Sequence, residues 1–123
     1  MKFRYKKENP DAKQRKKKCD ELRSQFSDKI PIICEKDPKS FHCRDIDKTH
    51  YLVRSDLTVS QFNLLIRKRI EIEKEAALFL LANGTHSITG DTLLSEIYER
   101  YKDSQDGFLY LTYADDYIIW GNI

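Results

Sequence analysis

Nucleophilic and metal-binding side chains are few in this sequence and stand far apart. Cys43 follows His42 directly and His50 comes seven residues later, so a cysteine nucleophile with a histidine base is the first chemistry to consider. Such a pair needs a third group that orients the base, and no residue marks one. Zinc sites use paired Cys or His ligands at short spacing, which the chain lacks. The sequence therefore predicts no enzyme activity, no metal site and no cofactor.

The remaining acidic residues and cysteines do not change this interpretation. The carboxylates are scattered over turns and the tail, at Asp45, Asp47, Asp103, Asp106, Asp115 and Asp116. Cys34 falls in an apolar run, where a cysteine usually serves as a small buried hydrophobe. Three widely spaced cysteines are an odd number, which predicts reduced thiols in the cytosol rather than a disulfide framework.

The most informative segment is residues 51–70, YLVRSDLTVSQFNLLIRKRI. It begins with a short strand, and Thr58 with Gln61 three residues later is the pattern of a helix capping box. Leu57 and Phe62 occupy the two positions of a hydrophobic staple around that cap. Apolar residues recur on one face of the helix, and three consecutive cations stand near its end. A strand with apolar side chains is thus followed by a helix with a cationic end.

Length and composition indicate one compact domain. A chain of 123 residues with 40% hydrophobic residues is able to bury a single core. No apolar run approaches the roughly 18 residues of a membrane span, and the first residues lack the apolar region of a signal peptide. Residues 1–24 carry ten Lys and Arg against four Asp and Glu, a net charge of +6 on a chain whose total is +2. This basic arm suggests an anionic partner, although a solvated helix face explains a charge run equally well.

The pattern of turns and periodicity predicts the order helix, hairpin, helix, strand, short helix, strand. Asn9 and Pro10 are expected to cap the first helix, whose apolar face would be formed by Ala12, Cys19, Leu22 and Phe26. Asp91 or Thr92 is expected to cap the last helix. Strands are predicted over 30–35, 51–53, 77–81 and 108–113, and helices from residue 10, over 59–70 and after the cap at Asp91 or Thr92, with Leu94, Ile97, Tyr98 and Tyr101 on one face. The order fits an α+β fold in which a β-grasp sheet is wrapped on one helix, although the order alone would also suit other α+β sandwiches.

Motifs along nearly the whole chain carry a family resemblance. In order they are MKFRYK, IPIICEK, DIDKTHYLV, SDLTVSQFNLLIRKRI, EAALFLLANG, FLYLTY and an aromatic-glycine pair near the end. Together they closely resemble the autophagy ubiquitin-like modifiers, the family of the gamma-aminobutyric-acid-receptor-associated protein and the microtubule-associated light chains. The resemblance implies a helical extension over 1–27, a ubiquitin-like β-grasp domain over 28–116, and a flexible tail with a processing site over 117–123.

The resemblance also implies a peptide-binding site at the second strand. Cargo receptors and autophagy proteins with an aromatic-x-x-aliphatic motif would add a strand there, with backbone hydrogen bonds supplying affinity and two pockets supplying specificity. The first pocket carries over to Leu22, Pro31, Ile33, His50, Leu52 and Phe108. The second carries over to Tyr51, Val53, Leu57, Phe62 and Leu65. The basic residues Lys29, Lys48, Arg67 and Arg69 would attract acidic residues that flank the motif.

A second function is implied at Gly121, which follows Trp120 and precedes two final residues. A cysteine protease would cut the Gly121–Asn122 bond, and E1-like and E2-like enzymes would join the new carboxylate to phosphatidylethanolamine. Glycine suits both steps because its carbonyl is unhindered by a Cβ. A monomer in the cytoplasm would thereby become anchored to the autophagosome membrane, since two lipid chains suffice for stable binding.

Several positions depart from the family pattern and leave alternatives open. Arg54 replaces the usual proline after the second strand, Lys48 is followed by Thr49 and His50 instead of further basic residues, and the tail before Trp120 is one residue longer. A paralogue that binds peptides but is not conjugated therefore remains an alternative. A rival class is a nucleic-acid or microtubule-binding module using residues 13–18. The absence of interleaved aromatic residues argues against nucleic acid, whereas acidic tubulin tails fit the family.

Overall fold

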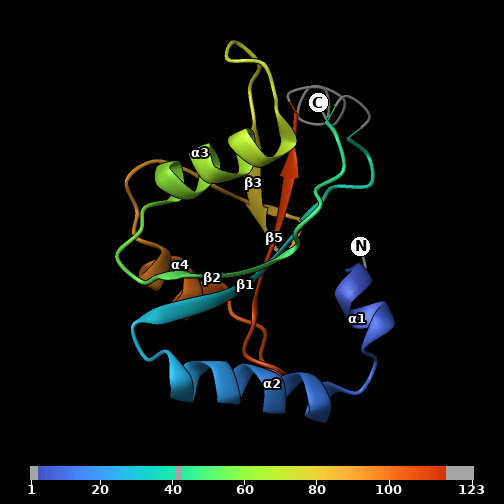
Figure 1. Cartoon of the computed structure of the whole chain (residues 1–123), viewed down its shortest axis with the longest axis vertical. Helices are drawn as coiled ribbons and strands as arrows, with labels where there is room; N and C mark the ends of the chain where they lie inside the picture. The colour runs from blue at the N-terminus through green and yellow to red at the C-terminus, as the bar shows by residue number, and fades with distance from the viewer. Residues whose placement is uncertain (1–2, 41–42, 116–123) are drawn as a thin grey trace.

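Helices cover both faces of one β-sheet in the computed structural model, which describes residues 3–40 and 43–115 (Figure 1). The elements in chain order are α1 (Arg4–Glu8), α2 (Ala12–Gln25), β1 (Lys29–Lys36), β2 (His50–Arg54), α3 (Val59–Ile70), β3 (Phe79–Ala82), β4 (His86–Ile88), α4 (Leu94–Tyr101) and β5 (Leu109–Ala114). Within the described residues the strand order is β2-β1-β5-β3-β4. The central pair β1 and β5 is parallel and the other pairs are antiparallel. This is the predicted α+β architecture.

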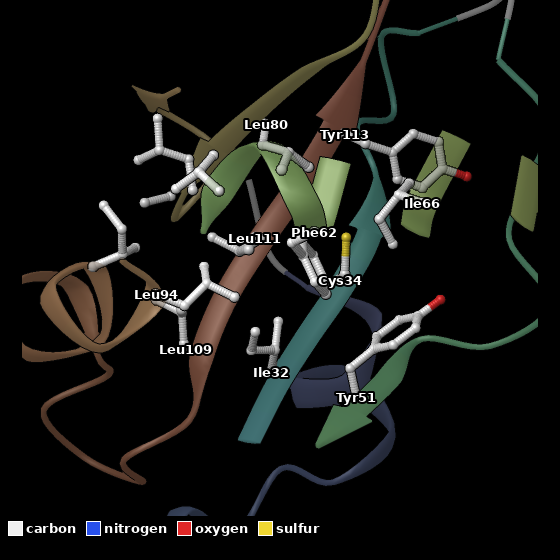
Figure 2. Close-up of a cluster of buried hydrophobic side chains, with 14 of the residues drawn as sticks. Ile32, Cys34, Tyr51, Phe62, Ile66, Leu80, Leu94, Leu109, Leu111 and Tyr113 are labelled. Carbon is white, nitrogen blue, oxygen red and sulfur yellow. The ribbon is translucent and has the colours of Figure 1, made fainter. Parts of the chain in front are cut away.

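Alternation along the central strands divides the interior into two cores. Ile32 and Cys34 of β1 point into the main core beneath α3 and α4, together with Leu109 and Leu111 of β5 (Figure 2). Ile33 points to the opposite face, where it packs with buried residues of the N-terminal segment and of β5; these are Phe3, Cys19, Phe108 and Tyr110. Successive side chains of a strand face opposite sides, so one strand serves both cores. The N-terminal helices therefore close a second layer over the sheet.

Helix α3 confirms the interpretation of its sequence. The Thr58 hydroxyl accepts a hydrogen bond from the Gln61 N–H at 3.1 Å, and the Gln61 side chain accepts one from the Thr58 N–H at 2.9 Å. This capping box pairs two backbone donors that the helix itself cannot pair. The helix ends at Ile70 because Glu71 adopts a left-handed conformation with φ of 54°. Its buried residues Phe62, Ile66 and Ile70 face the sheet.

The N-terminal extension differs from the prediction in three respects. A separate helix, α1, was not predicted, and Asn9 ends it rather than beginning the next one. Helix α2 is capped instead by Asp11, whose carboxylate accepts a hydrogen bond from the Lys13 N–H at 2.9 Å. The expected apolar face is wrong at its end, because Phe26 is 37% exposed. Arg15, which was not predicted to belong to that face, is buried in it.

Two further predictions near the C-terminal half need correction. The expected cap of α4 is wrong, because Leu93 holds the N-cap position and makes no side-chain hydrogen bond there. Strand β4 was not predicted, and it pairs antiparallel with β3 across a turn in which Asn83 and Gly84 have φ of 55° and 75°.

Pro31 lies where β1 pairs only with β2, before pairing with β5 begins at Ile32, which agrees with its missing N–H. Helices long and apolar enough to cross a membrane are absent from the described residues.

Candidate functional site

A groove with a volume of about 730 Å³ lies between the N-terminal helices and the β1–β2 hairpin. All six residues predicted for the first pocket line it: Leu22, Pro31, Ile33, His50, Leu52 and Phe108. The other lining residues are Tyr5, Asn9, Gln14, Arg15, Lys18, Ile32, Lys48 and Tyr51. Residues from the N-terminal extension, the hairpin and the start of β5 thus meet at one site. Their role in peptide binding remains a prediction.

Strand register explains why the hairpin residues share this groove. Pro31 pairs with Leu52, and Ile33 pairs with His50, in the antiparallel ladder between β1 and β2. Paired residues of neighbouring strands project from the same face, so these four side chains point together toward α2. Ile33 is fully buried and forms the floor, whereas His50 is exposed at the rim.

A buried ion pair fixes the wall formed by α2. The Arg15 Nε atom donates to the Asp106 carboxylate at 2.7 Å, with side chains only 4% and 0% exposed. A guanidinium N–H of Arg15 also donates to the Asn9 carbonyl at 2.7 Å, which ties the end of α1 to α2. The Tyr110 hydroxyl donates to the same Asp106 carboxylate at 2.6 Å. Burial, together with this hydrogen bond, raises the pKa of Tyr110 far above its usual value, so the phenol stays a donor.

Helix α1 contributes a second wall through Tyr5. The Glu35 carboxylate of β1 accepts hydrogen bonds from the backbone N–H groups of Arg4 at 2.8 Å and Tyr5 at 3.0 Å. This pairing occupies N–H groups that the first turn of a helix leaves free. The Tyr5 ring then lies edge-on to Phe108 and to His50, with centroids 5.4 Å and 5.0 Å away. Tyr5 was not predicted as a groove residue, because the helix that carries it was not predicted.

The backbone beside the groove has a free edge. Strand β2 ends the strand order and pairs only with β1 among the residues that the structure describes. An exposed edge presents unpaired N–H and C=O groups that another extended chain is able to pair with. The groove therefore combines an apolar floor with an available strand edge.

The second predicted set lies on the opposite side of the hairpin, against the main core. Tyr51 and Phe62 are 6% and 0% exposed, and their rings meet edge-on at 5.5 Å (Figure 2). The Tyr51 hydroxyl donates to the Lys48 carbonyl at 2.6 Å. Both side chains are thus buried in the main core, although Tyr51 also lines the groove described above. Val53, Leu57 and Leu65 are partly buried and pack on the same core, which leaves them as the accessible part of the predicted set.

The four predicted flanking cations have different surroundings. The Arg67 guanidinium donates to the carbonyls of Glu73, Lys74 and Ala76 at 3.0, 3.1 and 2.6 Å, so its main role is to hold the loop after α3. Arg69 pairs with Asp47 at 3.2 Å in an exposed position. Lys48 is exposed beside the groove and Lys29 is half-buried at the other end of the hairpin.

The other chemical candidates of the sequence are placed as follows. Cys34 is fully buried in the main core, as predicted. Within residues 3–40 and 43–115, no group of three His, Cys, Asp or Glu side chains is arranged to hold a metal ion. His42, Trp120, Gly121 and the Gly121–Asn122 bond lie outside the described residues.

Comparison with known proteins identifies the family. The sequence model of the family described as "Autophagy protein Atg8 ubiquitin like" matches residues 14–120. The chain belongs to the Atg8 family. Autophagy-related protein 8 of Neurospora crassa is 46% identical over 116 residues, which cover 94% of this chain and 93% of that protein. Autophagy-related protein 8 of Pichia angusta is also 46% identical, over 94% of this chain and 90% of its own length.

A solved Atg8 structure confirms the fold. The crystal structure of Trypanosoma brucei ATG8 superimposes with a TM-score of 0.85 at 37% sequence identity, covering 94% of this chain and 97% of the other. The predicted ubiquitin-like β-grasp with an N-terminal helical extension is therefore correct. This chain is an autophagy ubiquitin-like protein.

Proposed function

We propose that this Atg8-family protein is a membrane-conjugated adaptor that binds aromatic-x-x-aliphatic peptides of cargo receptors and autophagy proteins. The observation that carries the proposal is the groove of about 730 Å³ beside the free edge of β2. An extended peptide pairs with the backbone of β2 and places its aromatic side chain against Leu52 and Phe108. This is strand addition, in which the backbone gives affinity and the pocket gives specificity.

The aliphatic residue of the motif binds on the other side of β2. It lies three positions after the aromatic residue, and Val53, Leu57 and Leu65 are the partly buried apolar residues available there. Tyr51 and Phe62 support this surface from the core without needing to contact the peptide. The aromatic residue enters the groove of about 730 Å³ and is therefore expected to supply most of the affinity.

The proposal includes processing and lipid conjugation at the tail. A cysteine protease removes Asn122 and Ile123, and E1-like and E2-like enzymes transfer the Gly121 carbonyl to the amine of phosphatidylethanolamine. The support is family membership together with the aromatic-glycine pair at positions 120 and 121. Two acyl chains then hold the adaptor on the autophagosome membrane.

Peptide binding is tested by replacing one groove leucine and one matched leucine elsewhere. Leu52→Ala is expected to weaken binding of an acidic aromatic-x-x-aliphatic peptide by about 2 kcal/mol, or about thirtyfold, as truncation of a central contact does. Leu64→Ala is the control, because Leu64 is 57% exposed on α3 and does not line the groove. Isothermal titration calorimetry measures both. Equal affinities of the two variants would refute the groove as the binding site.

Processing is tested separately from binding. Full-length protein is incubated with the processing protease of its own host, and intact mass spectrometry measures the product. The expected product lacks the last two residues, and Gly121→Ala is expected to remain uncut while binding peptide normally. An uncut wild-type chain, or a cut elsewhere, would favour the adaptor that is not conjugated.

A further inference from the structure

A second cavity, with a volume of about 450 Å³, lies at the opposite end of the sheet from the groove. It is bounded by the end of α3, the loop that follows α3 and the end of β5, which lie close together in Figure 1. Phe108, which lines the groove, precedes β5, whereas Asp115, which lines this Asp115 cavity, follows it. The two described linings share no residue. The Asp115 cavity is therefore separate from the proposed peptide site.

Asp115 places a buried carboxylate without a partner in this cavity. The residue is 5% exposed, and both carboxylate oxygens lack a hydrogen-bond partner among the described residues. Its backbone N–H donates to the Ser40 hydroxyl at 3.3 Å, which holds the residue in position. Burying a carboxylate without a donor is costly, and nearly all buried polar groups in proteins are paired. A donor supplied by a ligand would therefore bind favourably at Asp115.

The entrance of the Asp115 cavity is acidic. Glu71, Glu73 and Glu75 belong to its lining and are exposed. Arg44 is the one cation of the described lining, and its guanidinium already pairs with the Glu71 carboxylate at 2.6 Å. The described lining thus holds four carboxylates against one guanidinium, a net charge of −3. A cleft with one dominant sign of charge concentrates ligands of the opposite sign, so the ligand that fits is a cation.

The chemistry of the lining favours an arginine side chain as that cation. Within the described residues no three His, Cys, Asp or Glu side chains are arranged to hold a metal ion. The two unpaired oxygens of Asp115 match the two parallel N–H donors of a guanidinium, which is also more weakly hydrated than an ammonium. Ile70, Ile72 and Ala76 line the cavity, and they offer apolar surface to the methylene stem of such a side chain.

The loop that forms one wall of the Asp115 cavity is already held in place. The Arg67 guanidinium donates to the carbonyls of Glu73, Lys74 and Ala76. The Ile72 N–H donates in turn to the Arg67 carbonyl at 3.3 Å. A preformed wall spares a ligand the cost of ordering the loop when it binds.

We propose that the Asp115 cavity is a second docking site, in which an arginine side chain of a partner protein binds the Asp115 carboxylate through two N–H groups. The glutamates at the entrance attract the segment that carries the arginine, and the apolar wall packs against its stem. The inference does not rest on the peptide groove or on lipid conjugation. A partner bound at this site leaves the groove open to a second ligand.

Titration of the isotope-labelled full chain, followed by nuclear magnetic resonance, tests the proposal with three capped tripeptides. The first has arginine between two glycines, the second has citrulline, which keeps the shape of arginine without its charge, and the third has lysine. The arginine peptide is expected to shift the backbone N–H signals of Ile72, Ala76 and Asp115 to saturation. It is expected to bind at least about tenfold more tightly than the citrulline peptide, because a buried charge pair is lost in the latter. The lysine peptide is expected to bind more weakly than the arginine peptide.

Three variants locate the contact. Asp115→Asn keeps the size of the side chain and is expected to weaken binding of the arginine peptide at least about tenfold. Glu75→Gln is expected to weaken it only about twofold, because exposed charges contribute modestly. Asp91→Asn is the control, because Asp91 is exposed and outside the described lining, and it is expected to keep wild-type affinity. The midpoint of urea denaturation is expected to stay the same or rise in Asp115→Asn, because the carboxylate has no partner in the described structure to lose.

Several results would overturn the proposal. One is the absence of a saturable shift with the arginine peptide in large excess, and another is equal affinity of wild type and Asp115→Asn. Equal binding of the arginine and citrulline peptides, or tighter binding of the lysine peptide, would overturn recognition of a guanidinium. A marked fall of the urea midpoint in Asp115→Asn would show that the carboxylate is structural. The proposed function is tested apart from all of these, because Asp115→Asn is expected to bind an aromatic-x-x-aliphatic peptide as tightly as wild type.

Discussion

Replacing Arg15 by methionine removes the charge from a buried ion pair while keeping much of the apolar length of the side chain. The Asp106 carboxylate, which is 0% exposed, would lose its cation. It would keep the Tyr110 hydroxyl at 2.6 Å and the Phe108 N–H at 2.9 Å as hydrogen-bond donors. The variant thus tests how much of the attachment of α2 depends on charge.

The expected loss of stability follows from the burial of this ion pair. Removing one partner of a buried ion pair usually costs about 3–5 kcal/mol, because the other charge is left uncompensated. The two remaining donors to Asp106 offset part of that cost, so Arg15→Met is expected to lower the free energy of unfolding by about 3 kcal/mol. A domain of this size has a stability of about 5–15 kcal/mol, so the variant should still fold.

The assay is urea denaturation followed by far-ultraviolet circular dichroism, arranged as a double-mutant cycle. Asp106→Asn alone leaves the guanidinium of Arg15 uncompensated, and the double variant removes both charges. The double variant is expected to lose about 1–3 kcal/mol less free energy of unfolding than the sum of the two single variants, because residues in contact are energetically coupled. Lys16→Met is the control, because Lys16 pairs with Asp20 in solvent and both side chains are about 60% exposed.

Two results would refute this reasoning. One is a decrease in the free energy of unfolding for Arg15→Met that is no larger than the decrease for Lys16→Met. Lys16→Met is expected to change stability by less than about 1 kcal/mol. The other is strict additivity in the cycle, which would show that the 2.7 Å contact carries no coupling energy. A related expectation concerns the groove, because Arg15 holds its wall. Peptide affinity should fall with Arg15→Met and stay unchanged with Lys16→Met.

Three further predictions concern single residues. Hydrogen bonds from Lys6 and from two backbone N–H groups outweigh the opposing effect of burial and hold the pKa of Asp103 below its usual value. Its contribution to stability is therefore present above about pH 4 and lost as pH falls further, and acid titration of Asp103→Asn should show a shallower decline than wild type. Gly107→Ala should lower the free energy of unfolding measured in urea by about 1–2 kcal/mol, because φ is +85° and the new Cβ would lie 3.1 Å from the Cys19 sulfur. Burial raises the pKa of the Cys19 thiol to about 11, so it should react with a maleimide at pH 7.5 only on unfolding, as timed mass spectrometry would show.

Helix α3 was predicted correctly, because its capping box and its apolar spacing both lie within the helix and the residue that caps it. Thr58, Gln61 and the spacing of Phe62 and Ile66 are close in sequence, and the structure places helix and capping box where these residues indicate. The assignment of β2 residues to the two faces of the sheet was also predictable, since alternation of side chains along a strand places Leu52 and Tyr51 on opposite faces. Alternation did not predict how deeply Tyr51 is buried. Its ring packs against Phe62 of α3, and this contact depends on how closely the helix approaches the sheet.

The sequence signal for strand β4 lies in the turn that precedes it. The pair Asn83-Gly84 is a signal for a hairpin turn, and in the structure it lies in the connection 83–85 between the paired residues Ala82 and His86. Strand β4 after this turn, His86–Ile88, is short and mostly exposed. The polarity of these residues concealed a strand whose partner, β3, was already predicted. Turn chemistry was therefore the better guide here than hydrophobic pattern.

The walls of the groove were beyond local prediction for a different physical reason. The sequence of α1 is five residues of mostly charged character, and so short a helix is unstable by itself. It forms because Glu35, some thirty residues away, accepts its first N–H groups. Arg15 likewise finds its partner ninety-one residues away at Asp106.

These distant contacts determine how wide the groove is. Its floor is formed by Ile33 of the hairpin, whereas its walls depend on the attachment of α1 and α2. Leu22 and Tyr5 reach the groove from those helices, so the proposed peptide binding is expected to depend also on Glu35 and Asp106, which hold the helices in place. Loss of the Glu35 carboxylate should therefore weaken peptide binding through displacement of Tyr5, even though Glu35 lies outside the groove lining. In the proposed function, we therefore expect peptide specificity to depend on the attachment of the N-terminal extension as much as on the β2 edge.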